Sequence, residues 1–181
     1  SLYIVVDDPY HASYKLNSDL SKISKWAEDW LVTFNPHKTE NMIISRKTKQ
    51  PFHPCLYMND VLINEVDMHK HLGVIFSSNG LWKQHIESII QKANSRIAVL
   101  RKLKYQLNRK SLEIMYFTFI RPLLEYADVI WNNITDDLAN KIEKLNLEAA
   151  RIVTGATKLT SIPLLYKETG WQTLQIRRKH H

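Results

Sequence analysis

Two adjacent carboxylates near the start of the chain could take part in metal-dependent chemistry. Asp7 and Asp8 directly follow the apolar run at 2–6, and two-metal phosphoryl transfer uses carboxylates from more than one strand. A neighbouring pair alone does not make such a site, because a third carboxylate from an earlier strand is required. We therefore expect this pair to end a strand or open a helix, where short polar side chains bond to nearby backbone.

One lysine lies in the short polar turn between a helical pattern and a strand pattern. Asn35-Pro36 ends the helical pattern, because proline removes a backbone donor and disfavours helical geometry in the preceding residue. Lys38 follows two residues later. A compact ammonium group can stabilise charge that develops on leaving oxygens, or protonate them. On the residues alone, however, Lys38 is typical of an exposed turn lysine.

Histidine and cysteine do not indicate a metal site. His69 and His71 have the two-residue spacing of one strand face but no cysteine or carboxylate partners, whereas structural zinc sites combine four such ligands. Cys55 is the single cysteine, which excludes an internal disulfide. Because it lies beside a predicted strand, we expect an inert buried thiol there.

The first 80 residues show the short, changing patterns of a small mixed α/β layer. Apolar residues at three- and four-residue spacing predict a helix over 11–34, and Asn59-Asp60 is a two-residue hairpin signal. The apolar face of the helix consists of Leu16, Leu20, Ile23, Ala27, Trp30 and Leu31. The predicted strands cover residues 2–6, 41–45, 56–58, 61–66 and 71–76.

From Leu81 onward the spacing of apolar residues is helical throughout. Pro122 interrupts the second helix, so we expect a kink there. The large aromatic residues Trp82, Trp131 and Trp171 are expected in the core. The predicted helices cover residues 82–103, 111–131, 135–155, 161–169 and 173–181.

Charge is unevenly distributed along the chain. Residues 1–80 hold 8 Lys/Arg against 9 Asp/Glu, whereas residues 81–181 hold 17 against 9, within a net charge of +7. A basic helical half predicts contact with a polyanion, most commonly nucleic acid, or a lysine-rich solvated face. We place the domain boundary near Gly80, where both the spacing and the charge change. No apolar run is long enough to predict a membrane span.

Four blocks of sequence together resemble one enzyme family. They are DLSKISKWAEDWLVTFNPHKTENMIIS, HKHLGVIFSSNGLWKQHI, IRPLLEYADVIW and ETGWQTLQIRRKHH. In this order and spacing they resemble the reverse transcriptases of non-LTR retrotransposons, the jockey-like group in particular. The resemblance implies an α+β fold. Residues 1–80 would be the last part of the polymerase palm, a small mixed or antiparallel sheet with one long helix, and residues 81–181 an all-α helical thumb.

The resemblance also implies roles for individual residues. Lys38 matches a lysine that is proposed to protonate or stabilise the pyrophosphate leaving group. His71, Leu72 and Gly73 match the primer grip, a tight hairpin that holds the primer end, where glycine lets the backbone approach a strand closely. The basic residues of the thumb region expected to contact phosphates are Lys92, Arg96, Arg101, Lys102, Lys104, Arg109 and Lys110.

The residues themselves leave alternatives open for the hairpin and the thumb. Residues 71–76 are also typical of a buried strand with a bulge at Gly73, and in either case we expect Leu72, Val74 and Phe76 to pack. Tyr105 lies among the basic residues and could stack on a base, but we expect it to pack.

The resemblance implies that the catalytic aspartates, which would bind Mg²⁺ in the intact enzyme, lie upstream of Ser1. We expect both ends of the chain to be truncated. We therefore expect a fragment of an RNA-directed DNA polymerase that is inactive alone and has no cofactor of its own. Its partners would be an RNA–DNA hybrid or duplex DNA and the upstream palm and fingers, inside the cell, in cytoplasm and nucleus. The alternative is a non-enzymatic basic helical module, a degenerate relic that binds nucleic acid or protein. An unpaired strand at 2–6 predicts low solubility.

Overall fold

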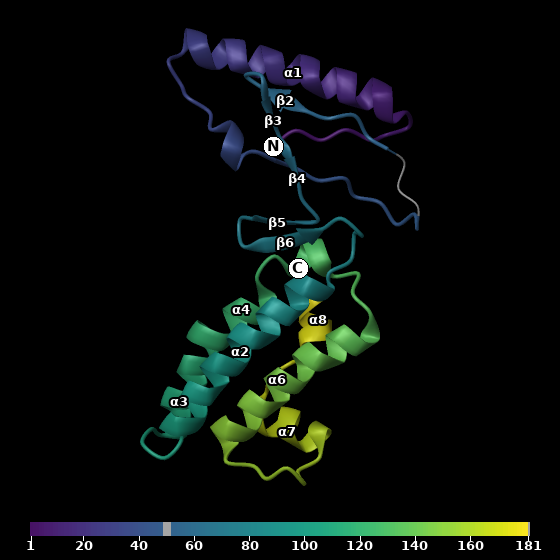
Figure 1. Ribbon diagram of the computed structural model, residues 1–181. Coiled ribbons are helices and arrows are strands. Elements are labelled where there is room, and N and C mark those ends of the chain that lie inside the picture. The colour runs from purple at the N-terminus through teal and green to yellow at the C-terminus, as the bar shows by residue number, and fades with distance from the viewer. Residues whose placement is uncertain (49–51, 181) are drawn as a thin grey trace. The chain divides into compact units, whose positions relative to one another are not determined.

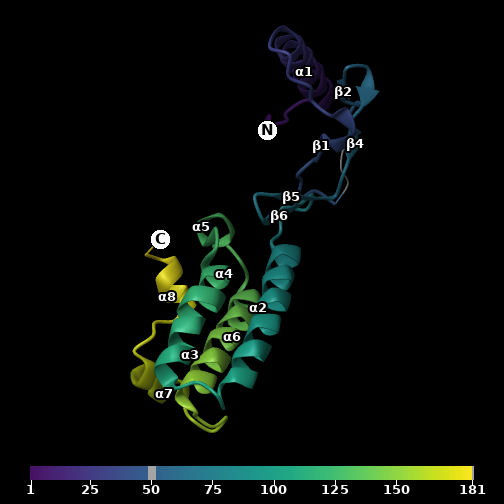
Figure 2. The same cartoon turned by 90° about the vertical axis from the view of Figure 1, so that its left-hand side faces the viewer.

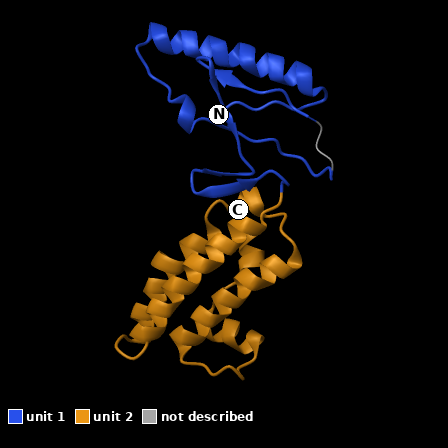
Figure 3. Ribbon diagram, viewed as in Figure 1, with its two compact units in different colours: residues 1–80 blue, residues 81–181 orange. Residues whose placement is uncertain are grey.

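A helix and three two-stranded ladders make up the first part of the chain. The computed structural model describes residues 1–48 and 52–180, and the chain divides at Gly80 into two units, 1–80 and 81–181 (Figures 1 and 3). Unit 1 contains α1 (Pro9–Asp29), the 3₁₀ turn η1 (Pro36–Lys38), β1 (Glu40–Asn41), β2 (Tyr57–Met58), β3 (Val61–Leu62), β4 (Asn64–Glu65), β5 (Met68–His71) and β6 (Val74–Ser77).

A carboxylate cap opens helix α1. Asp8 accepts hydrogen bonds from the backbone N–H groups of Tyr10 and His11 at 3.2 and 3.1 Å. Such a cap satisfies donors that the first helical turn leaves free. The prediction that the aspartate pair opens a helix is therefore confirmed for Asp8. The helix packs its apolar face on the β2–β3 hairpin, in a cluster of Leu16, Leu20, Ile23, Leu56, Met58 and Ile63.

Helix α1 ends earlier than its sequence pattern predicts. Leu31 has a φ of +54°, which turns the chain away from the helix axis directly after Trp30. Trp30 is 69% exposed and stacks on Trp26, with ring centroids 6.2 Å apart. The prediction that Trp30 and Leu31 lie on the buried face is therefore wrong, because both residues lie beyond the last helical turn.

The strands of unit 1 form separate ladders where a single small sheet was expected. Strands β1 and β4 pair in parallel, whereas β2–β3 and β5–β6 are antiparallel. The hairpin predicted at Asn59-Asp60 is confirmed, and its φ values of +50° and +59° are those of a type I′ turn. Only the start of the strand predicted at 41–45 lies in a ladder, although Ser45 still donates its N–H to the Ser78 carbonyl at 2.8 Å.

Residues 2–6 form no strand, contrary to the prediction. A strand exists only through hydrogen bonds to a neighbouring strand, and no segment in the described part of unit 1 pairs with these residues. Tyr3 and Val5 are consequently exposed. The low solubility expected from this edge stays a prediction.

Every secondary-structure element that the structure describes in unit 2 is a helix (Figure 2). Helices α2 and α6 lie side by side, and the α3–α4 run packs against both. The helix ends predicted at Gly155 and Gly170 are confirmed, since both glycines have a positive φ there. The elements are α2 (Lys83–Leu103), α3 (Arg109–Met115), η2 (Tyr116–Ile120), α4 (Arg121–Glu125), α5 (Asp128–Trp131), α6 (Asp136–Thr154), α7 (Ile162–Thr169) and α8 (Leu174–Arg178).

The interruption expected at Pro122 is a change of helix type. Element η2 is a π-helix, in which the Arg121 N–H donates to the Tyr116 carbonyl five residues back. Pro122 has no N–H with which to continue an α-helical ladder. A second break follows at Ala127, which has a φ of +53°. The single helix predicted at 111–131 is therefore a series of shorter helical segments.

The core of unit 2 lies between α2, α6 and the α3–α4 run. Trp131 is fully buried at its centre, and Trp82 and Trp171 pack against the same cluster. The core position predicted for the three tryptophans is thus confirmed. The other fully buried large side chains of this core are Tyr116, Ile86, Ile97, Leu100, Ile120, Leu124, Ile142 and Leu174.

A hydrogen-bonded polar network crosses this core. The Tyr116 hydroxyl donates to Asn146, whose amide donates to Glu143 Oε1 at 2.9 Å. The Tyr166 hydroxyl also donates to Glu143. Burial is the larger cause and this hydrogen bond the second cause of a raised pKa of Tyr166, so its hydroxyl stays protonated and can donate. The network joins α6 to η2 and α7.

Glu125 at the end of α4 is held between two arginines. Arg121 Nε lies 3.1 Å from Glu125 Oε1, and Arg177 Nη2 lies 3.1 Å from Glu125 Oε2. Burial acts to raise the pKa of Glu125, but the hydrogen bond from Arg177 and the charges of both arginines outweigh it, and the pKa is lowered from 4.5.

The free energy of unfolding is expected to fall as the pH drops below 4.5. A carboxylate whose pKa is lower in the folded than in the unfolded state stabilises the fold above the unfolded pKa, and this stability is lost as the pH falls through the folded pKa. Urea denaturation at a series of pH values measures the effect. Glu125→Gln should flatten the profile, whereas Glu28→Gln, at an exposed position of α1, should not. Equal profiles for the three proteins would contradict the prediction.

Candidate nucleic-acid interface

Lys38 lies at a fixed corner between α1 and β1. Asn35 Oδ1 accepts a hydrogen bond from the His37 N–H at 3.0 Å, and the Asn35 carbonyl accepts one from the Thr39 hydroxyl at 3.1 Å. The Thr39 N–H donates to the Pro36 carbonyl at 3.1 Å. The backbone on both sides of Lys38 is thus held while its side chain is exposed. The predicted helix-to-strand corner is confirmed, and the chemical role of the lysine stays a prediction.

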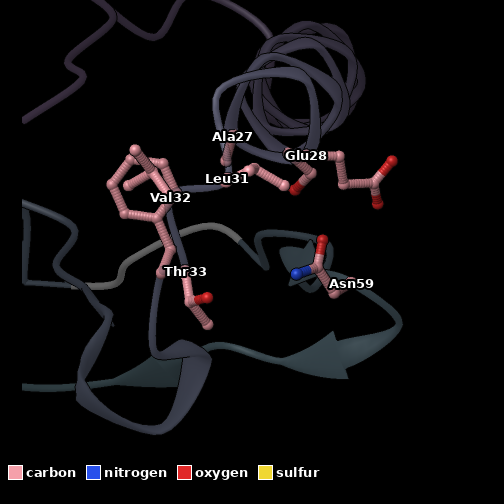
Figure 4. Close-up of a pocket in the computed structure, with 8 residues that line it drawn as sticks. Ala27, Glu28, Leu31, Val32, Thr33 and Asn59 are labelled. Carbon is pink, nitrogen blue, oxygen red and sulfur yellow. The ribbon is translucent and has the colours of Figure 1, made fainter.

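An open pocket of about 390 Å³ lies beside the C-terminal end of α1 (Figure 4). Among the lining residues that the structure describes, Glu28 carries the one charge, which is negative and so does not favour a phosphate. None of the candidate site residues selected from the sequence is among its described lining residues. The lining residues that the structure describes are Ser24, Ala27, Glu28, Leu31, Val32, Thr33, Phe34 and Asn59.

Residues 71–76 form a hairpin tip and the strands beside it. His71 of β5 pairs with Val74 of β6, and Leu72 and Gly73 form the turn with φ values of +46° and +87°. Val74 is buried, whereas Leu72 is 77% exposed. The alternative of one buried strand with a bulge at Gly73 is therefore wrong, and so is the expectation that Leu72 packs. The structure has a tight hairpin here, and its contact with a primer stays a prediction.

Gly73→Ala is expected to destabilise this hairpin by about 1 kcal/mol, because a Cβ atom disfavours a left-handed backbone. Leu72→Asn should have the opposite effect, since asparagine tolerates this conformation better than leucine does. Hydrogen exchange of the β5 and β6 amides measures both changes. Slower exchange in the Gly73 variant than in the parent chain would contradict the turn geometry.

The imidazole and carboxylate groups that the structure describes in unit 1 do not come together as a metal site. His69 Nδ1 lies 2.6 Å from Glu40 Oε2, and the His69 ring stacks on His71 with centroids 6.0 Å apart. Among residues 1–48 and 52–180, no group of three or more His, Cys, Asp or Glu side chains could hold a metal ion. The carboxylates present therefore do not fit a two-metal centre, because Asp8 is used as the cap of α1.

Cys55 is exposed, so the expected buried thiol is wrong. Side chains alternate between the two faces of an extended segment. Leu56 and Met58 point into the apolar cluster under α1, so Cys55 and Tyr57 point outward.

The basic residues selected in unit 2 do not share one face. Arg96 and Arg101 are five positions apart on α2, which places them about 140° apart around the helix axis. Arg101 forms an ion pair with Glu148 of α6. Arg109 Nη1 lies 2.5 Å from Glu168 Oε1, and its Nη2 donates to the Glu168 carbonyl at 2.7 Å. The charges of Arg101 and Arg109 are therefore compensated within unit 2.

The remaining selected cations lack such compensation. Lys92, Lys102 and Lys110 are exposed and form no ion pair with any residue that the structure describes. Lys104 Nζ lies 4.7 Å from the ring centroid of Tyr105, which is 83% exposed. The expectation that Tyr105 packs is therefore wrong.

Arg96 is held by neutral groups. It donates to the Phe119 carbonyl, and its Cζ lies 4.4 Å from the centroid of the Phe119 ring. The sequence reasoning did not select Phe119. The signal that could have found it is the pair of phenylalanines at 117 and 119, shortly before the helix-interrupting Pro122.

Over most of its length, the chain is similar to RNA-directed DNA polymerases of Drosophila mobile elements. The probable RNA-directed DNA polymerase from transposon BS of Drosophila melanogaster is 22% identical over 176 residues, which cover 94% of the chain and 19% of that relative. The RNA-directed DNA polymerase from mobile element jockey of Drosophila funebris is 25% identical over 178 residues, 94% of the chain and 19% of the relative. Its counterpart in Drosophila melanogaster is 26% identical over 148 residues, 80% of the chain and 16% of the relative.

The resemblance to jockey-type polymerases seen in the four sequence blocks is confirmed by these relatives. The chain spans about a fifth of the length of the polymerases it matches. No protein-family model matches the chain, and no solved structure does so. Within the described residues, none of the helices has the length and apolar character needed to cross a bilayer.

Proposed function

We propose that this chain is part of the RNA-directed DNA polymerase of a non-LTR retrotransposon, with residues 1–80 as the last part of the palm and residues 81–181 as the thumb. The observation that carries the proposal is the similarity to jockey-type polymerases across 94% of the chain. Because the matched region is about a fifth of those relatives, polymerisation is proposed for an intact protein that contains this chain.

Within that polymerase, the chain is proposed to hold the primer–template duplex. The β5–β6 hairpin ends in a tight turn at Leu72 and Gly73, and Leu72 is exposed at its tip. A hairpin that contacts the end of a primer strand needs such an exposed turn. In unit 2, Lys92, Lys102 and Lys110 are exposed cations without internal ion pairs among the described residues. Lysines of this kind contact phosphates irrespective of base sequence.

Lys38 is proposed to act on the pyrophosphate leaving group. Asn35 accepts hydrogen bonds from the His37 N–H and from the Thr39 hydroxyl, which fix the backbone of the turn. The exposed side chain of Lys38 therefore extends from a defined position. Mg²⁺ would neutralise the phosphates in the intact enzyme, but the described carboxylates of this chain do not fit its site. We therefore propose that the isolated chain incorporates no nucleotides.

Binding and extension of a recessed RNA–DNA primer–template test this function. The labelled hybrid is titrated with the 181-residue chain at about 50 mM salt, and Mg²⁺ with deoxynucleotides is then added. The expected result is binding without extension. Absence of binding to the hybrid and to duplex DNA would contradict the proposed duplex contact. Extension would contradict the assignment of Asp8 to helix capping and the proposed inactivity of the isolated chain.

A further inference from the structure

The π-helical turn η2 brings two phenylalanine rings to the surface of unit 2. Phe119 is 43% exposed and Phe117 is 37% exposed, although Tyr116 and Ile120 beside them are buried. The turn is wider than an α-helical one, because the Arg121 N–H reaches the Tyr116 carbonyl five residues back. π turns of this kind are frequent at functional sites.

One of these rings carries a cation that no carboxylate neutralises. Arg96 donates to the Phe119 carbonyl, and its guanidinium lies over the Phe119 ring. In the described part of unit 2, Arg96 has no carboxylate within ion-pair distance, in contrast to Arg101 and Arg109. A guanidinium has five N–H donors, so Arg96 retains donors and its full charge. Lys92 lies one turn earlier on the same face of α2 and is exposed.

We propose that Lys92, Arg96 and Phe119 form a binding subsite for an unpaired nucleotide, here called the nucleotide subsite. Its phosphate lies between the two cations, and its base stacks on the exposed part of the Phe119 ring. The bases of a duplex are stacked on one another, so only an unpaired strand can offer a base to this ring. The assignment of a nucleic-acid ligand to this subsite rests on the proposed function. The subsite extends that function from binding a duplex to binding a single strand.

An acidic protein segment would use only part of this surface. A carboxylate can pair with Lys92 and Arg96, but it offers no planar face to Phe119. Because the cation and the aromatic ring are placed together, an unpaired nucleotide matches the site better than an acidic side chain does.

Phe117 provides a matched control two residues away. Its ring packs on Trp171, with centroids 5.4 Å apart. Arg121 lies over the Phe117 ring at 5.1 Å, but this guanidinium is committed to Glu125, with Arg121 Nε 3.1 Å from Glu125 Oε1. Phe117 is therefore, like Phe119, a phenylalanine with an arginine over its ring, but the charge of that arginine is already paired with Glu125.

The test compares two labelled single strands of about 12 nucleotides, a length within the usual site size of such proteins. One is oligothymidine, and the other is abasic and keeps only sugars and phosphates. The full chain is expected to bind oligothymidine about tenfold more tightly, equivalent to about 1.4 kcal/mol. Phe119→Leu should reduce this ratio to about one without weakening abasic binding, whereas Phe117→Leu should leave the ratio unchanged. Arg96→Gln should weaken binding to both strands.

Phe119→Trp separates stacking from folding, because it keeps an aromatic face and should retain the ratio. Equal affinity of the parent chain for the two strands, or equal effects of the Phe117 and Phe119 variants, would overturn the nucleotide subsite. Polyglutamate that competes as well as oligothymidine would also overturn it and would indicate an acidic protein partner. Hybrid binding with no preference for bases would overturn only the subsite, whereas absence of binding to every nucleic acid would overturn the proposed function as well.

Discussion

Trp131→Ala is expected to lower the free energy of unfolding by about 3–5 kcal/mol, the usual cost of truncating a large buried aromatic side chain. Trp131 is fully buried, and its Nε1 donates to the Tyr126 carbonyl at 3.0 Å. The ring packs edge-on against His85, with centroids 6.1 Å apart, and lies below the guanidinium of Arg178. Truncation would leave a cavity between α2, α5 and α8 and would remove one hydrogen bond to the Tyr126 carbonyl. Urea denaturation followed by far-ultraviolet circular dichroism measures the loss.

Trp30→Ala is the matched control for this prediction. Trp30 is an exposed tryptophan whose ring stacks on Trp26, so its truncation should change the free energy of unfolding by about 0.5 kcal/mol. A Trp30 effect as large as that of Trp131 would contradict the burial pattern described for the two units.

Lys38→Leu in an intact polymerase is expected to lower the rate of nucleotide incorporation by about 10²–10⁴-fold, the usual contribution of a general acid or base. The loss should appear in kcat, because charge on the pyrophosphate develops only in the transition state. Binding of the primer–template should change little, since Lys38 is a single cation at one corner of unit 1. Single-turnover incorporation on an RNA template measures the chemical step.

Lys38→Arg distinguishes proton donation from charge stabilisation. Arginine keeps the positive charge but does not release a proton near neutral pH, so it should restore the rate only if charge alone is needed. Lys22→Leu serves as the control, because Lys22 lies on α1 in an ion pair with Asp19 at 2.9 Å. An unchanged rate in the Lys38→Leu enzyme would exclude a role for this lysine in leaving-group chemistry.

The features that could be predicted from the sequence depend on neighbouring residues. The cap at Asp8, the helix ends at Gly155 and Gly170, and the Asn59-Asp60 turn each involve residues a few positions apart. Local backbone preferences decide such features, so short patterns suffice to find them.

The features that could not be predicted depend on distant partners. Arg101 and Arg109 look like phosphate ligands in the sequence, but their carboxylate partners lie 47 and 59 residues further along the chain. Residues 2–6 have the composition of a strand, yet strand pairing depends on a neighbour that no local pattern specifies. Trp30 fits the apolar spacing of α1, but the backbone turn at Leu31 lies just beyond it.

The salt dependence of hybrid binding decides whether this chain holds nucleic acid through its phosphates. Affinity for a short RNA–DNA hybrid is measured from about 50 to about 300 mM salt, and log affinity is plotted against log salt concentration. The expected result is a linear decrease in log affinity with a slope no steeper than about −4.5. This limit corresponds to one phosphate contact for each uncompensated cation, namely Lys92, Arg96, Lys102, Lys104 and Lys110. Arg96→Gln should reduce the slope by about 1, whereas Arg101→Gln should leave it unchanged, because Glu148 already compensates that charge. A slope near zero, or equal effects of the two arginine substitutions, would contradict this interpretation.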